Sequence, residues 1–257
     1  MCELFGVSSG AKIRVNGLLN EFFSHSVRHR NGWGMAIFHD AGVSLEKEPV
    51  QASESAYLRE RLRQPVSVRS MMAHIRLATV GTMEYKNCHP FVMRDGCGRR
   101  WTLAHNGTIF DASVLEAYVH TQEGETDSER ILCGLIETVC KRQRALGRDL
   151  SAEERFELVD GFVGQIAPGN KLNLLIYDGD LMYVHTNYAH SLYVRTKGET
   201  ALFATVPLDG GQWDEVPFTA VCAYRAGRMA YIGKAHGHEY RDCEHDMRTL
   251  FMAYAQL

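Results

Sequence analysis

The order of strand-like and helix-like segments constrains the fold of this chain more than any other feature. Segments typical of strands begin the chain and return after Pro168, and the clearest helical patterns lie between them. Runs of like elements favour an α+β layered architecture over alternating βαβ units. We expect strands over 3–8, 32–40, 42–48, 66–76 and 98–107, and then over 171–179, 181–187, 191–196, 201–206, 221–227 and 228–234.

The helical patterns differ in how clearly they begin and end. Thr126 and Glu129 have the spacing of a capping box, and an apolar stripe follows them. Pro65 ends the pattern that precedes it, because proline cannot continue a helix. We expect helices over 16–28, 53–65, 126–147 and 151–163, and a short one near 240–255.

Composition excludes several classes of protein. The 257 residues include no linker, internal repeat or charge tract, which predicts a single domain over 1–257. The net charge of −3 gives no reason to expect a nucleic-acid partner. No apolar run reaches about 18 residues, so no membrane helix is expected. The first 30 residues carry polar and charged side chains throughout and predict no secretory signal.

The seven cysteines are scattered, with no C-x-x-C pair, which predicts a reduced, cytoplasmic protein. Cys2 has an unusual position, because the strand-like "ELFGV" follows it at once and would hold it in place. Removal of Met1 would give Cys2 a free α-amine. A fixed thiol beside an amine is a nucleophile with its own base.

Three further positions admit two interpretations each. Arg76 follows a strand and is either a surface side chain or a fork that binds a carboxylate. Asn106-Gly107 is either a hairpin turn or a pair of oxyanion donors. Asp127 either complements a helix dipole or binds a substrate ammonium group.

Metal and cofactor sites are not expected. His236, His238, Cys243 and His245 match no standard zinc spacing. No P-loop or G-x-G-x-x-G motif occurs.

The functional interpretations of Cys2, Arg76, Asn106-Gly107 and Asp127 describe one substrate when they are taken together. A thiol, two oxyanion donors, a carboxylate binder and an ammonium binder suit glutamine or another γ-glutamyl amide.

Six short motifs carry a resemblance to a known family. They are "MC" (1–2), "RNGWGMAIF" (30–38), "AHIRLATVGT" (73–82), "NCHPF" (87–91), "LAHNGTI" (103–109) and "TDSE" (126–129). In this order they resemble the class II glutamine amidotransferases, and the stand-alone members in particular. The resemblance implies a four-layer αββα sandwich of two antiparallel sheets flanked by helices, of the N-terminal-nucleophile hydrolase type.

The resemblance also implies roles for individual residues. Cys2 would be the nucleophile, and Asn106 and Gly107 would form the oxyanion hole. Arg76 would bind the substrate carboxylate and Asp127 its ammonium group. Thr79 would lie in the loop that closes over glutamine. The expected reaction cleaves the γ-amide through a γ-glutamyl thioester and releases ammonia.

Three hypotheses about function remain open at this point. The first is a glutaminase that passes ammonia to a partner synthase. The second is a γ-glutamyl amidohydrolase that acts on a peptide or metabolite. The third is a binding protein that keeps the fold without the chemistry, which the presence of all the expected site residues disfavours.

Overall fold

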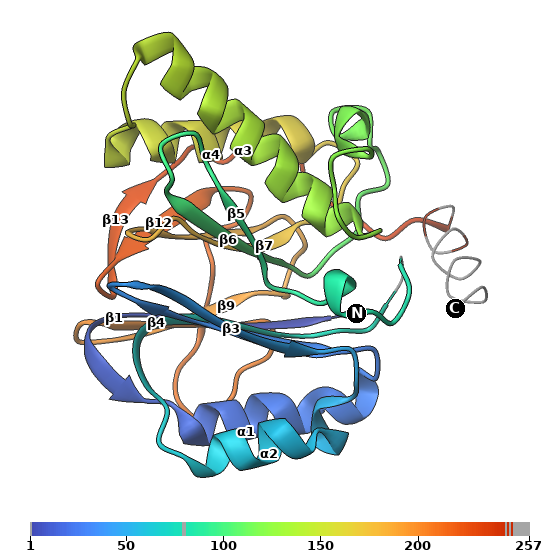
Figure 1. Ribbon diagram of the computed structural model, residues 1–257, viewed down its shortest axis with the longest axis vertical. Coiled ribbons are helices and arrows are strands. Elements are labelled where there is room, and N and C mark those ends of the chain that lie inside the picture. Colours follow the sequence, from blue (N-terminus) through green and yellow to red (C-terminus); the bar gives the residue numbers. More distant parts are fainter. Residues whose placement is uncertain (1, 79–80, 245, 247, 249–257) are drawn as a thin grey trace.

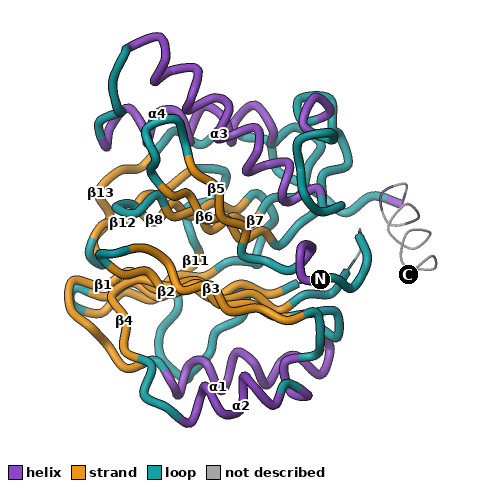
Figure 2. Tube along the Cα trace, viewed as in Figure 1, coloured by secondary structure: helices purple, strands orange, loops and turns teal. Residues whose placement is uncertain are grey.

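Two antiparallel sheets pack face to face between two layers of helices, as Figures 1 and 2 show. This computed structural model describes residues 2–78, 81–244, 246 and 248. The layer order confirms the predicted αββα sandwich. The first sheet contains, in spatial order, β11 (Asp214–Glu215), β9 (Tyr193–Lys197), β10 (Thr200–Ala204), β1 (Glu3–Arg14), β4 (Ser67–Ile75), β2 (Trp33–His39) and β3 (Gly42–Glu48).

The second sheet carries the longer helices on its outer face (Figure 1). Its strands are β13 (Arg228–Ile232), β12 (Val221–Arg225), β8 (Met182–Thr186), β7 (Asn173–Tyr177), β6 (Arg100–His105) and β5 (Phe91–Arg94). The helices are α1 (Asn16–Ser24) and α2 (Ala56–Arg63) below the first sheet, and α3 (Asp127–Leu146) and α4 (Ala152–Ile166) above the second. Single 3₁₀ turns occur at His25–Arg28, Ala52–Glu54, Tyr85–Asn87 and Glu116–Tyr118.

Three apolar cores hold the layers together. One lies between α1, α2 and the first sheet, one between the two sheets, and one between the second sheet and α3 and α4. Phe5 and Val7 of β1 point to the first core and Leu4 to the second, so both faces of this strand are buried. A strand buried on both faces needs a continuous apolar run, which explains why the chain begins with strand-like sequence.

Several predicted boundaries differ from the structure. The first strand continues beyond residue 8 to Arg14, and the helix expected over 16–28 ends at Ser24 and continues as a 3₁₀ turn. Strands β5 and β11 were not predicted, because both are very short. The helix expected near 240–255 lies largely outside the described residues.

The predicted capping box of α3 is only half formed. Thr126 accepts a hydrogen bond from Glu129 N–H at 3.3 Å, as expected. The Glu129 carboxylate, however, accepts hydrogen bonds from the N–H groups of Glu123 and Gly124 at 2.8 and 2.7 Å. It therefore fixes the loop before the helix, whereas the complete box occurs at Ser151 in α4.

Candidate active site

Cys2 lies directly before β1, whose neighbours in the sheet are β4 and β10. Its Sγ is 3.4 Å from both the N–H nitrogen and the carbonyl oxygen of Leu77, which follows β4 closely. Burial raises the pKa of the Cys2 thiol, while the Leu77 N–H and the charge of Arg76 act in the opposite direction. The thiol is therefore held against a main-chain donor that can stabilise its anion.

Arg76 is buried at the end of β4 and binds main-chain carbonyl groups. Its Nη1 donates to Thr82 O at 3.0 Å and more weakly to Asn31 O at 3.5 Å, and its Nη2 donates to Gly81 O at 2.9 Å. Burial lowers the pKa of Arg76 below its ordinary value, against the charges of Cys2 and Asp127. The predicted surface alternative for Arg76 is wrong. Thr79, expected in the same loop, lies outside the described residues.

The segment around Asn31 supports this loop from the other side. Asn31 Oδ1 accepts a hydrogen bond from Ala78 N–H at 3.0 Å, and its own N–H donates to Arg76 O at 3.0 Å. Nearby, a Cβ on Gly34 would lie 1.9 Å from the carbonyl oxygen of His89. Glycine is therefore required where the motifs "RNGWG" and "NCHPF" cross.

Glu125 and Asn87, for which no role was predicted, anchor the loop at residues 81–82. Glu125 accepts hydrogen bonds from the N–H and hydroxyl of Thr82 at 2.9 and 2.8 Å, and these hold the pKa of Glu125 at about 2. Asn87, which is fully buried, donates to both Thr82 O and the Glu125 carboxylate at 3.0 Å. Both residues fall within or beside the quoted motifs, which was the signal that could have found them.

Asn106 and Gly107 do not form a hairpin turn. The chain continues beside the segment 171–173, because Asn106 N–H donates to Asn173 O at 2.9 Å and Thr108 N–H to Lys171 O at 3.0 Å. A Cβ on Gly107 would lie 1.9 Å from Lys171 O. Glycine is therefore needed here because the two backbone segments lie close together, and not because the chain turns. Asn106 Oδ1 is buried and has no hydrogen-bond partner among the described residues.

Asp127 begins α3 and is largely buried. Its carboxylate accepts a hydrogen bond from Ile109 N–H at 2.8 Å and lies 3.2 Å from Ser128 Oγ. Ser128 Oγ also lies 2.9 Å from Nδ1 of His105, the residue before Asn106. Hydrogen bonds thus connect the start of α3 to the end of β6.

The charges of three predicted site residues act on one another. Arg76 lowers the pKa of the Cys2 thiol and Asp127 raises it, so all three lie within electrostatic range. The structure therefore brings Cys2, Arg76 and Asp127 together, and the His105–Ser128 contact connects them to Asn106 and Gly107.

The histidines of these motifs are buried in the interior. The ring centroids of His74 and His89 lie 4.1 Å apart with an angle of 37° between the rings, and burial lowers the pKa of both well below the ordinary value. They therefore pack as neutral rings beside Arg76. Among the described residues, no group of three or more His, Cys, Asp or Glu side chains is arranged to hold a metal ion.

Residues 236–242 contact Phe110, Lys171 and Asn187, beside the segment that follows Asn106. Tyr240 stacks on Phe110 with ring centroids 5.5 Å apart, and its N–H donates to Asn187 O at 2.8 Å. The Lys171 ammonium group lies 3.2 Å from the centroid of the Tyr188 ring and 3.7 Å from an oxygen of Asp242. Burial lowers the pKa of Lys171 to about 8.

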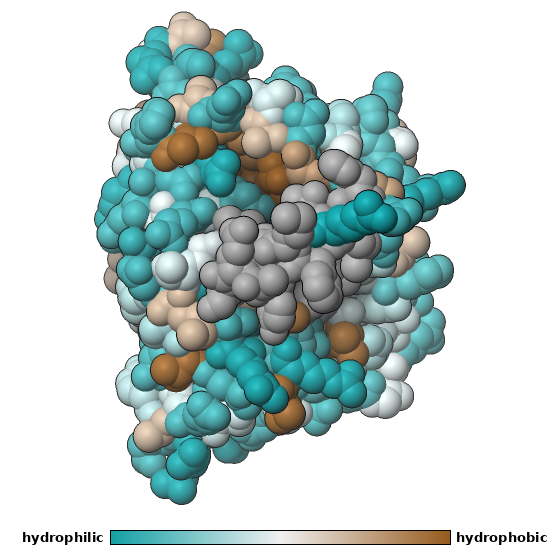
Figure 3. Space-filling model, turned by 90° about the vertical axis from the view of Figure 1, so that its right-hand side faces the viewer, coloured by the Kyte–Doolittle hydropathy of each residue, from teal (hydrophilic) through white to brown (hydrophobic). Residues whose placement is uncertain are grey.

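Figure 3 shows that the end of the molecule where the chain begins is mainly hydrophilic, with separate hydrophobic patches.

The αββα sandwich is shared with solved glutamine amidotransferases of the N-terminal-nucleophile type. A protein from Pseudomonas aeruginosa described as a predicted glutamine amidotransferase has a TM-score of 0.63 at 23% identity, covering 90% of this chain and all of that one. The phosphoribosylpyrophosphate amidotransferase of Bacillus subtilis has a TM-score of 0.67 at 17% identity, covering 92% of this chain and 49% of that one.

The sequence comparisons then define the family. The family model described as "Glutamine amidotransferases class-II" matches residues 1–198. An uncharacterized protein of Methanocaldococcus jannaschii is 30% identical over 91% of this chain and 72% of its own. The Escherichia coli protein YafJ, whose name assigns it provisionally to the glutamine amidotransferases, is 30% identical over 73% of this chain and 74% of its own. The chain belongs to the class II glutamine amidotransferases.

The described helices give no sign of a membrane span. None of them is both long enough and apolar enough to cross a bilayer.

Proposed function

We propose that this protein hydrolyses the γ-amide of glutamine with Cys2 as its nucleophile. The observation that carries the proposal is the position of Cys2 Sγ, 3.4 Å from the Leu77 N–H nitrogen and within electrostatic range of Arg76 and Asp127. A carboxylate binder and an ammonium binder near one thiol suit the two charged groups of one amino acid.

The reaction begins when removal of Met1 frees the α-amine of Cys2. This amine, whose reference pKa is about 7.7–8.0, takes the thiol proton. The sulfur then forms a bond to the carbonyl carbon of the γ-amide, and the amide oxygen becomes an oxyanion. The C–N bond breaks, the ammonium form of the α-amine gives its proton to the departing ammonia, and a γ-glutamyl thioester remains. Water hydrolyses the thioester to glutamate and restores the thiol.

The neighbouring residues bind and orient the substrate. The side-chain amide of Asn106 and the N–H of Gly107 stabilise the oxyanion. Arg76 binds the α-carboxylate and also bonds the carbonyls at 81–82, so binding of substrate is connected to the loop that includes Thr79. Asp127 accepts hydrogen bonds from the α-ammonium group.

The family favours glutamine as the substrate and ammonia as the product for a partner synthase. We also infer one domain over 1–257, because each sheet contains strands from both halves of the chain. The cytoplasmic location stays a prediction from the cysteine spacing. A γ-glutamyl peptide or metabolite as the natural substrate is an outcome that the experiment below can distinguish.

The test is intact-mass analysis after incubation with 6-diazo-5-oxo-norleucine, a reactive glutamine analogue. Protein whose untreated mass shows that Met1 is absent should gain one adduct. Without this treatment, the same protein should release ammonia from glutamine. Cys2→Ala should gain none, and Cys97→Ala, which removes an exposed thiol elsewhere, should react like the wild type. An adduct on Cys2→Ala, or glutamine hydrolysis that survives this substitution, would overturn the mechanism.

The same preparation tests the substrate class. Hydrolysis of γ-glutamyl peptides at least ten times faster than hydrolysis of glutamine would replace the glutaminase assignment with the amidohydrolase. A glutaminase rate that rises on addition of a partner would support ammonia transfer.

A further inference from the structure

A cavity of about 700 Å³ lies between the two sheets, away from the candidate active site. Ser9 of β1 lines it, seven residues along the strand from Cys2. At about 3.3 Å per residue these two positions are about 23 Å apart. The cavity therefore opens at the opposite end of the sandwich, and its volume falls in the range of sites for small molecules.

The floor of the cavity is aromatic. Phe38 of β2 and Tyr177 of β7 stack across the two sheets with ring centroids 4.1 Å apart and an angle of 30° between the rings. Both pack against the apolar core between the sheets. Burial raises the pKa of Tyr177 to about 12, so its hydroxyl keeps its proton and can donate a hydrogen bond.

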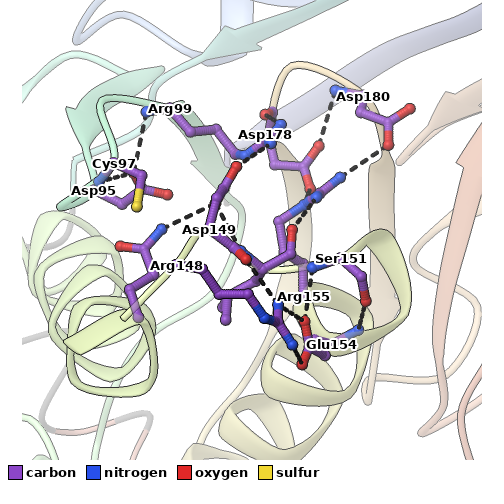
Figure 4. A network of polar contacts seen from close by, with 12 residues as sticks. Asp95, Cys97, Arg99, Arg148, Asp149, Ser151, Glu154, Arg155, Asp178 and Asp180 are labelled. Carbon is purple, nitrogen blue, oxygen red and sulfur yellow. Dashed lines mark hydrogen bonds and ion pairs between the residues drawn. The ribbon is translucent and has the colours of Figure 1, made fainter. Parts of the chain in front are cut away.

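One wall is fixed by a network of ion pairs, which Figure 4 shows. The buried carboxylate of Asp178 accepts hydrogen bonds from Arg155 Nε at 2.6 Å and from the Tyr183 hydroxyl at 2.7 Å. Arg155 Nη2 donates to Asp180 at 2.8 Å. Because Arg155 and Asp178 are almost fully buried, this wall is formed before any ligand binds.

The same network neutralises most of the negative charge around the cavity. Asp180 also accepts two hydrogen bonds from Arg225, at 2.6 and 2.7 Å. Asp149 accepts one from Arg99 at 2.8 Å. Three of the four carboxylates among the described lining residues are therefore bound to arginine, and Asp40 is the fourth.

Three other cations of the cavity lining are not neutralised in this way. Lys12, Arg69 and Arg100 line the cavity and form no ion pair with any carboxylate of the described residues. Among the described residues, Arg100 donates a hydrogen bond only to the carbonyl oxygen of Ala41, at 3.3 Å. The cavity thus has a surplus of positive charge in a chain whose net charge is −3.

We propose that this cavity is a second binding site, for a small anionic molecule that carries a planar ring. The ring would lie against Phe38 and Tyr177, and the anionic group, a phosphate or a carboxylate, would face Lys12, Arg69 and Arg100. Arginine and lysine beside an aromatic surface form the arrangement that recognises such molecules. The proposal does not depend on the chemistry assigned to Cys2.

The test uses 1-naphthyl phosphate as the probe and isothermal titration calorimetry of the whole chain as the measurement. We expect one equivalent of the probe to bind. The affinity should fall at least threefold between 50 and 300 mM salt, because the Debye length decreases roughly twofold over this range. Inorganic phosphate lacks the ring and 1-naphthol lacks the charge, so each should bind at least about tenfold more weakly, a loss of about 1.4 kcal/mol. Protein alkylated at Cys2 should bind the probe equally well.

Variants locate the site. The double substitution Lys12→Ala and Arg69→Ala should lower the affinity at least about tenfold, and the same charge change at Lys141 and Arg144 on the outer face of α3 should leave it unchanged. If the double variant fails to fold, Arg69→Gln alone gives the same comparison. Absence of binding at 10 mM probe and low salt, or equal affinity in the cavity and control variants, would overturn the proposal.

Discussion

Nδ1 of His105 lies 2.9 Å from Oγ of Ser128. The other ring nitrogen, Nε2, lies 3.1 Å from the carbonyl oxygen of Lys171, which can only accept. Burial lowers the pKa of His105, so the ring is neutral and its one proton resides on Nε2. Nδ1 must then accept the hydroxyl proton of Ser128, which leaves the Asp127 carboxylate without a donor from this hydroxyl. That carboxylate is therefore available for another donor, such as a substrate ammonium group.

Ser128→Ala should destabilise the protein, because it leaves Nδ1 of His105 buried without a partner. We expect the free energy of unfolding to fall by about 1–3 kcal/mol. Urea denaturation measures this loss. Ser24→Ala, at the exposed end of α1, should change it by less than about 0.5 kcal/mol. Equal stability of the two variants would contradict the hydrogen bond inferred between His105 and Ser128.

Asp127→Asn should separate binding from folding. Asparagine keeps an oxygen that can accept the Ile109 N–H and loses only the charge. A charge-assisted hydrogen bond is worth about 1.5–3 kcal/mol, so KM for glutamine should rise about 10- to 150-fold, with a small change in the thermal midpoint. Steady-state kinetics and a thermal melt together check both statements. An unchanged KM would remove Asp127 from the proposed ammonium site.

Gly107→Ala should impair both stability and catalysis, because the new Cβ would lie 1.9 Å from Lys171 O. We expect unfolding to become easier by about 1–3 kcal/mol. Displacement of one oxyanion donor should lower kcat about 10²- to 10³-fold. The control is Gly161→Ala in α4, where a Cβ meets nothing within 4 Å. That variant should be more stable by about 0.5–1 kcal/mol, with normal kcat.

Acid should destabilise the protein through its buried histidines. The pKa of His185 is lowered by burial to about 3, from about 6.5 in the unfolded chain. Between these values the unfolded state binds a proton that the folded state excludes. Stability is therefore complete above pH 6.5 and falls as the pH decreases towards 3, by up to about 4 kcal/mol from this residue.

The measurement is urea denaturation at pH 7 and pH 4.5. His185→Gln should reduce the difference between the two pH values, while substitution of the exposed His190 should not. A difference that is the same in all three proteins would show that His185 does not cause the acid sensitivity.

The sequence predicts elements well where burial imposes a regular pattern. The apolar segment at 171–179 and the stripe of 126–147 both form their expected elements, because one or both faces are buried. Asn106-Gly107 shows the limit of local signals. Its turn preference is overridden by pairing with residues 171–173, which are far away in the sequence. The support of the 81–82 loop by Asn87 and Glu125 was not predicted, because the motifs place both residues in or beside the site without showing which side chains meet there.

The position of β1 inside its sheet has a consequence for the synthesis of the chain. Leu4 N–H donates a hydrogen bond to Thr205 Oγ1, 201 residues further along, and β1 pairs with β10 over Phe5–Ser9. A ribosome makes Cys2 long before it makes the strand that completes the sheet around it, and contacts this distant in sequence form slowly. The thiol therefore reaches its place beside Leu77 within a closed sheet only after β10 has been made.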